Sequence, residues 1–88
     1  MNNSIKREDI MDLLSKSEAA VSTVHDKCTI VSVKLENGFV ITESSACVDP
    51  ENYSEEIGFN ECLKKIESRL WELEGYALQK KLYEEGIL

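Results

Sequence analysis

The last third of the chain carries a helical pattern that is long for a protein of 88 residues. Its apolar side chains recur in steps of four, three, four, three and four residues, which is the spacing of a coiled-coil seam. They are Phe59, Leu63, Ile66, Leu70, Leu73 and Ala77. A second, adjacent stripe holds Trp71, Leu78 and Leu82. We expect one stripe to pack on the protein's own strands and the other to face a second copy of the chain.

The expected ends of this helical segment follow from four residues. Asp49 and Pro50 predict its beginning, because Asp caps a helix and Pro fits the first helical position. Gly58 lies inside the pattern, so we expect one short turn first and the main helix after it. The main helix should run to about Glu84, where Gly86 ends it.

Two β-rich runs, residues 28–35 and 39–42, stand on either side of Asn37-Gly38. Asn-Gly is the strongest short-range signal of a β-hairpin, because both central residues of the tight turn need a positive φ. A loop of only these two residues would pair Leu35 with Val40. The core face would then hold Val31, Val33, Leu35 and Val40. The opposite face would hold Ile30, Phe39 and Ile41.

Residues 5–18 predict a short amphipathic helix that begins after Ser4, with Ile10, Leu13 and Leu14 on one face. Residues 19–22 either extend this helix or join it to the next element. The predicted fold class is therefore α+β in a single domain, residues 1–88. Its parts are an N-terminal helix, a β-hairpin and a long C-terminal helix packed on the hairpin.

The charge is unevenly distributed along the chain. The formal net charge is −7, and residues 35–63 supply all of it, because they contain seven acids and no base. The acids are Glu36, Glu43, Asp49, Glu51, Glu55, Glu56 and Glu61. A base-free segment disfavours direct binding of nucleic acid, whose phosphates need Lys and Arg. It favours a partner with a basic surface.

The residue inventory offers little for catalysis. His25 and Cys28 have the spacing of two metal ligands, but zinc needs three or four, and the chain has no second histidine. Cys28, Cys47 and Cys62 are odd in number and widely spaced, so we expect buried free thiols and not a disulfide framework. No glycine-rich phosphate loop and no Ser-His-Asp pattern is present. We expect no enzymatic activity, no metal and no cofactor.

The location of the protein is also predicted from composition. No run approaches the roughly 20 apolar residues that span a bilayer. The first eight residues lack the apolar stretch of a signal peptide. We therefore expect a cytoplasmic protein, viral or bacterial, that does not interact with membranes.

Three segments together resemble a known family. They are Leu35-Glu36-Asn37-Gly38-Phe39, then Ser45 to Tyr53 with Glu56-Ile57-Gly58, then Leu70 to Tyr76. In this order they are similar to the phage gene 49/gene 66 family of small proteins from tailed bacteriophages and prophages. The resemblance implies a non-structural accessory protein made inside an infected bacterium. It transfers no catalytic residue.

Three functions remain open at this point. The first is a stoichiometric inhibitor of a host or defence protein, such as an anti-CRISPR protein or a nuclease inhibitor, that binds through the seven acids of residues 35–63. The second is an oligomeric binder of small molecules, such as a sponge for nucleotide defence signals, with phosphate contacts from Lys64, Lys65 and Arg69. The third is a structural or assembly protein. Self-association through Trp71, Leu78 and Leu82 is expected under all three.

Overall fold

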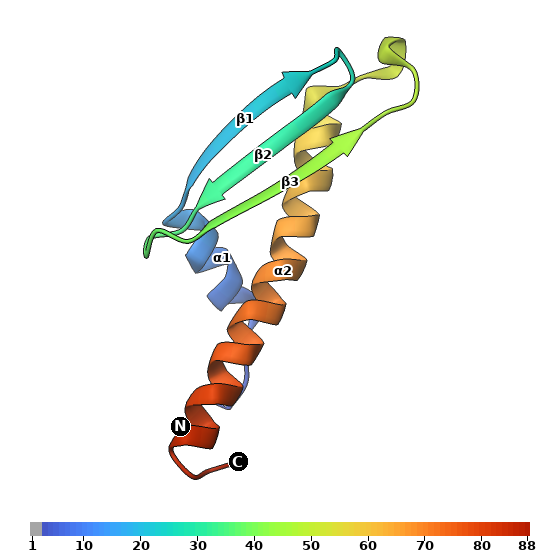
Figure 1. Ribbon diagram of the computed structural model, residues 1–88. Helices are drawn as coiled ribbons and strands as arrows, with labels where there is room; N and C mark the ends of the chain where they lie inside the picture. The colour runs from blue at the N-terminus through green and yellow to red at the C-terminus, as the bar shows by residue number, and fades with distance from the viewer. Residues whose placement is uncertain (1–2) are drawn as a thin grey trace.

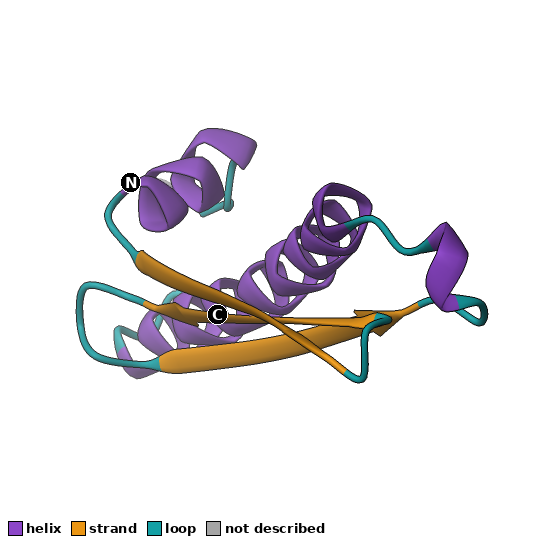
Figure 2. Ribbon diagram, turned by 90° about the horizontal axis from the view of Figure 1, so that it is seen from above, coloured by secondary structure: helices purple, strands orange, loops and turns teal. Residues whose placement is uncertain are grey.

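The computed structural model describes residues 3–88 and has the predicted α+β class (Figure 1). The elements are α1 (Arg7–Ser15), β1 (Glu18–Val24), β2 (Cys28–Lys34), β3 (Val40–Ala46), the short 3-10 helix η1 (Pro50–Asn52) and α2 (Glu55–Glu84). The strands form one antiparallel sheet in the order β1-β2-β3. Both α-helices lie on the same face of this sheet, so the molecule has two layers (Figure 2).

Helix α1 is shorter at both ends than the predicted range of residues 5–18. It begins at Arg7, and Lys6 occupies the N-cap position, where its N–H donates to the Asp9 carboxylate at 2.8 Å. It ends at Ser15, whose hydroxyl donates to the carbonyl of Asp12. Its Ile10 is completely buried in the core, as the apolar pattern of the helix suggested.

Strand β1 was not predicted from the sequence. Residues 19–22 were expected to extend α1 or to act as a joint, yet they pair with β2, with Val21 opposite Val31 and Ala19 opposite Val33. Two alanines favour a helix locally, but the pairing partner decides the conformation of such a segment. The turn from β1 to β2 places His25 and Asp26 at φ of +54° and +57°, a backbone region in which Asp and His are enriched.

The β2–β3 hairpin exists, but its register differs by one residue from the prediction. Lys34 and Val33 pair with Val40 and Ile41, because the loop has three residues and Gly38 alone has a positive φ, +94°. The Leu35 N–H donates to the Phe39 carbonyl at 2.8 Å, which closes the loop.

This register reverses the side-chain predictions for β3. A one-residue shift moves every side chain of a strand to the other face. Ile41 is completely buried, whereas Val40 is about half exposed. The predicted core residues of β2 and its turn, Val31, Val33 and Leu35, are all buried. Ser32 and Thr42 share the face away from the helices, joined by a hydrogen bond of 3.1 Å, so that face is more polar than expected.

Helix α2 follows the predicted ends with one correction. The short turn before it is η1, where Asp49 accepts the N–H of Glu51 at 2.9 Å. The break falls at Tyr53–Ser54, so Gly58 lies inside the helix and does not interrupt it. Beyond Glu84, the Gly86 N–H donates to the carbonyl of Tyr83 and the Ile87 N–H to that of Leu82. This bond pattern, with Gly86 at φ +76°, is a Schellman motif.

The core lies between α2, α1 and the strands β2 and β3. Its buried hydrophobic residues are Ile10, Val31, Val33, Leu35, Ile41, Cys62, Ile66 and Leu70. On α2 the buried positions recur every four residues from Gly58 to Leu70. Of the predicted seam, Ile66 and Leu70 are buried, Phe59 and Leu63 are half-buried, and Leu73 and Ala77 are exposed. Within residues 3–88, no helix is both long enough and apolar enough to cross a membrane.

Candidate functional site

The seven predicted partner-binding acids do not form one surface. Glu36 lies in the β2–β3 turn, at the opposite end of the sheet from η1 (Figure 1). Glu43 is only partly exposed and pairs with Arg69 at 3.2 Å. Glu61 pairs with Lys64 at 3.2 Å. Ion pairing and separation therefore remove these three acids from a common binding surface.

The other four acids gather where η1 meets α2. Asp49, Glu51, Glu55 and Glu56 are all exposed, and among residues 3–88 they take part in no ion pair of the structure. Asp26, in the β1–β2 turn, lies at the same end of the sheet (Figure 1). We call these five residues the acidic end. Lys27 is a base at this end, and its Nζ donates to the carbonyl of Val48 at 3.3 Å.

A chain of hydroxyl groups attaches the acidic end to the sheet. The Tyr53 hydroxyl lies 2.7 Å from Oγ1 of both Thr29 and Thr23, and Thr23 donates to Glu55 at 3.2 Å. Each hydroxyl has one proton. Because Thr23 donates to the carboxylate, it must accept from Tyr53, which in turn accepts from the completely buried Thr29. Within residues 3–88, no buried side-chain oxygen or nitrogen is left without a hydrogen-bond partner, and the chain of hydroxyls ends on the exposed Glu55 carboxylate.

Gly58 completes this attachment. A Cβ at this position would lie 2.7 Å from the Cβ of Thr29 and closer still to its hydroxyl. The absence of a side chain therefore allows the first turns of α2 to approach β2 directly. Asp49, Pro50, Tyr53 and Gly58, which carry much of the family resemblance, thus have structural roles that hold the acidic end in place. Sequence reasoning missed the pairing of Tyr53 with Thr29, because no local pattern links residues so far apart.

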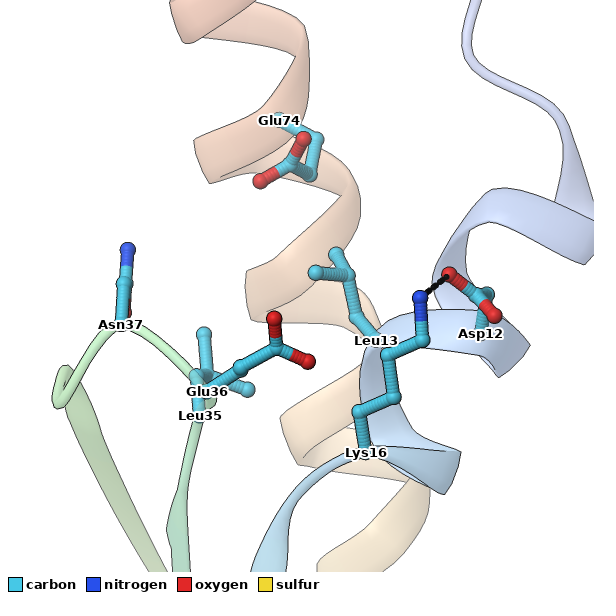
Figure 3. Close-up of a pocket in the computed structure, with 7 residues that line it drawn as sticks. All are labelled: Asp12, Leu13, Lys16, Leu35, Glu36, Asn37 and Glu74. Atoms are coloured by element: carbon cyan, nitrogen blue, oxygen red, sulfur yellow. Dashed lines mark ion pairs between the residues drawn. The ribbon is translucent and has the colours of Figure 1, made fainter.

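A cleft of about 300 Å³ lies at the other end of the sheet, between α1, α2 and the β2–β3 turn (Figure 3). Leu13 and Leu35 contribute its apolar wall. Lys16 pairs with Asp12 at 3.0 Å. The pKa of Lys16 is raised, first by this hydrogen bond to Asp12, then by the charge of Asp12 and that of Glu36. The remaining carboxylates of the cleft, Glu36 and Glu74, make it unfavourable for an anionic ligand.

The three bases proposed for phosphate contacts are already engaged. Lys64 pairs with Glu61, and Arg69 pairs with Glu43. Lys65 donates to the carbonyl of Ser44 at 2.6 Å. A nucleotide at this surface would have to replace each of these contacts.

The three residues predicted to form an oligomer interface differ in how far they are buried. Trp71 is 39% exposed and Leu78 is half-buried. Leu82 is 2% exposed within the single chain, so it is covered by its own protein. Gly75, close to Trp71 on α2, has no atom near the position of a Cβ, so the isolated chain does not require glycine there.

The three cysteines are free thiols, as expected, but only Cys62 is buried, whereas Cys28 and Cys47 are half-buried. Cys62 is completely buried, and burial raises its pKa. Its thiol donates to the carbonyls of Glu43 and Thr29 at 3.6 and 3.7 Å. Among the described residues, no group of three or more His, Cys, Asp or Glu side chains is placed to hold a metal ion.

Comparison with known proteins gives one result. The model of the phage protein (N4 Gp49/phage Sf6 gene 66) family matches residues 1–82. No curated protein and no solved structure is similar enough to count as a match.

Proposed function

The chain belongs to the phage protein (N4 Gp49/phage Sf6 gene 66) family, and we propose that it acts by stoichiometric binding of a host or defence-system protein in the bacterial cytoplasm. The binding surface is the acidic end. Its partner has a basic surface of the kind that a nuclease uses to hold nucleic acid. By occupying that surface, the protein inhibits its target without catalysis.

One observation carries this proposal. Four carboxylates within residues 49–56 are exposed, take part in no ion pair among residues 3–88, and gather where η1 meets α2. Clustered carboxylates of one sign attract a basic surface and accelerate its association. The backbone that carries them is attached to the sheet through Tyr53, Thr29 and Gly58, so little backbone ordering is needed when the partner binds.

Two other functions have weaker support. A sponge for nucleotide signals needs cationic contacts, but Lys64, Lys65 and Arg69 are engaged with the chain itself. A purely structural or assembly role does not call for a cluster of exposed acids without ion pairs.

The experiment is capture of partners from a bacterial host with tagged protein, at low and at high salt. The test variant is Glu51→Lys/Glu56→Lys, because neither side chain makes a hydrogen bond or ion pair with any residue from 3 to 88. The matched control is Glu72→Lys/Glu84→Lys, which changes the net charge equally but lies far along α2. We expect one host protein, released by salt, with affinity reduced at least about tenfold in the test variant only.

Three results would contradict the proposal. They are capture that is unchanged at high salt, equal losses in both variants, and a nucleotide ligand without any protein partner. A protein partner bound equally well by both variants would place the binding surface away from the acidic end.

A further inference from the structure

The two outer strands of the sheet differ in how well their open edges are protected against pairing with another strand. An outer strand presents unpaired N–H and C=O groups that invite pairing with another strand, and proteins block such edges with charges, especially Lys. On β3 this protection is present. Lys65 reaches from α2 to the carbonyl of Ser44, and Arg69 holds the neighbouring Glu43.

Strand β1 has no such protection. Residues 19–24, Ala-Ala-Val-Ser-Thr-Val, include no charge and no proline. Every residue of the strand except Val24 is exposed, and Val21 is 40% exposed. Helix α2 packs mainly against β2 and β3, and Figure 1 shows β1 on the side of the sheet away from it.

The hydrogen-bond pattern shows which residues of β1 face outward. Leu35 bonds to Phe39, and Cys47 bonds to Lys27, so the odd-numbered residues of β2 and its turns point toward β3. In an antiparallel sheet the bonding direction alternates along a strand, so the even-numbered residues of β2 point toward β1.

Their partners in β1, such as Ser22 opposite Ile30, therefore use their backbone groups inside the sheet. The N–H and C=O groups of Ala19, Val21 and Thr23 are left pointing outward. These three residues are spaced symmetrically about Val21.

This symmetry makes β1 complementary to itself. If two copies meet edge to edge in antiparallel orientation, Val21 of one lies opposite Val21 of the other, and Ala19 lies opposite Thr23. The outward N–H and C=O groups of one β1 strand then pair with those of the other copy, as an isologous two-fold interface requires. We propose that the protein forms a homodimer in which two β1 strands pair about Val21, giving one six-stranded antiparallel sheet.

The charge distribution favours a second copy as the occupant of this edge. Two chains of net charge −7 repel each other most strongly where their carboxylates lie. Residues 19–24 carry no charge, so the centre of the contact at Val21 holds no carboxylate of β1, and the carboxylates nearest in β1 and its hydrogen-bonded partners, Glu18 and Glu55, lie at its ends. Of the acidic end, Glu55 lies beside this contact through its hydrogen bond with Thr23. The dimer is argued from the edge of β1 alone and does not depend on the proposed function.

The first test replaces Val21 by proline. Proline removes the outward N–H of an edge strand without breaking the bonds to β2. The control is Thr42→Pro, which removes an outward N–H from the protected edge of β3. By sedimentation, we expect a dimer for the wild type and Thr42→Pro, and self-association of Val21→Pro weakened at least about tenfold. Circular dichroism of each variant confirms that it is folded.

A second test does not depend on how proline is tolerated. Across a strand pair, Cα atoms at opposite positions are close enough for a disulfide. Val21→Cys should therefore form an intermolecular disulfide under mild oxidation, whereas Ala20→Cys should not, because residue 20 lies opposite residue 22 of the other copy.

Salt separates this proposal from binding at the acidic end. Screening reduces repulsion between two acidic chains, so dimerisation should strengthen with salt while capture of a basic partner weakens. A monomeric wild type at all concentrations overturns the dimer. So does a Val21→Pro dimer as strong as the wild type, which would place the contact on another surface, such as the stripe with Trp71.

Discussion

The two halves of α2 differ sharply in what surrounds them. The sheet-bound half, residues 55–70, buries Gly58, Cys62, Ile66 and Leu70 against the strands. The projecting half, residues 71–84, has among the described residues one fully buried side chain, Leu82. A helix of 30 residues is about 45 Å long, whereas a strand of seven residues spans about 23 Å. The sheet therefore covers only half of the helix.

This difference separates two sources of helix stability. The sheet-bound half is held by burial and by close approach to β2. The projecting half depends on its own backbone bonds, on the C-terminal hook of residues 85–88 and on contact with the N-terminal part of the chain (Figure 1). Changes of the same kind should therefore have different effects in the two halves.

The largest contrast is expected between the two leucines that each half buries. Leu70→Ala should lower the free energy of unfolding by about 3–4 kcal/mol, because it leaves a cavity in the main core. Leu82→Ala should cost about half as much, since its surroundings are a helix end and a short tail that can relax around the gap. Urea unfolding of both variants measures the two values. Equal losses would show that the projecting half is as tightly packed as the sheet-bound half.

Alanine at the two helical glycines should act in opposite directions. Gly58→Ala should destabilise the protein by about 3 kcal/mol, because the new methyl group overlaps Thr29. Gly75→Ala should stabilise it by about 0.5–1 kcal/mol, because the new Cβ meets no atom and alanine favours the helix. Thermal unfolding of the pair tests both signs. A stable Gly58→Ala protein would mean that α2 is not held against β2 at this point.

Removal of the Tyr53 hydroxyl should have an intermediate effect. Tyr53→Phe leaves the buried Thr29 hydroxyl without its partner, at a cost of about 1–2 kcal/mol. Tyr76→Phe is the matched control, because Tyr76 is 69% exposed and should change stability little. Denaturant unfolding of both variants separates the loss of the Tyr53–Thr29 hydrogen bond from the general effect of removing a tyrosine hydroxyl.

The smallest effect concerns the β1–β2 turn. His25→Asn/Asp26→Gly should raise stability by roughly 0.5–1 kcal/mol, because Asn-Gly adopts positive φ at lower cost. The same exchange in the β2–β3 loop is not available, since Asn37-Gly38 is already present there. A loss of stability in this variant would show that His25 or Asp26 makes a contribution beyond the turn itself.

The sequence correctly predicted the elements whose ends or turns are determined by residues close together in the chain. Asp49, Pro50 and Gly86 correctly marked the ends of the C-terminal helical segment, and the hairpin lies around Asn37-Gly38. Three features were wrong or missed for lack of a local signal. Strand β1 forms because β2 offers a partner, the hairpin register follows from a three-residue loop, and Gly58 is required by Thr29, which is distant in sequence.

The sequence predicted a binding site of seven acids, but only four of them lie together in the structure. The sequence correctly identified the segment without bases, yet Glu43 pairs with Arg69 of α2, and Glu61 pairs with Lys64 one turn later on the same helix. A linear charge count cannot show the pair of Glu43 with Arg69, because it joins a strand to a helix 26 residues farther along the chain. The same contacts occupy the bases that the alternative ligand site would need.

The projecting half of α2 also acts as a spacer of defined length. The molecule extends 55 Å along its longest axis, with the acidic end at one extreme and the C-terminal hook at the other. Each helical turn inserted between residues 71 and 78 would move the hook about 5.4 Å farther away. A fluorophore or affinity tag fused after Leu88 should therefore lie several nanometres from anything bound at η1, and its distance could be tuned without altering the sheet.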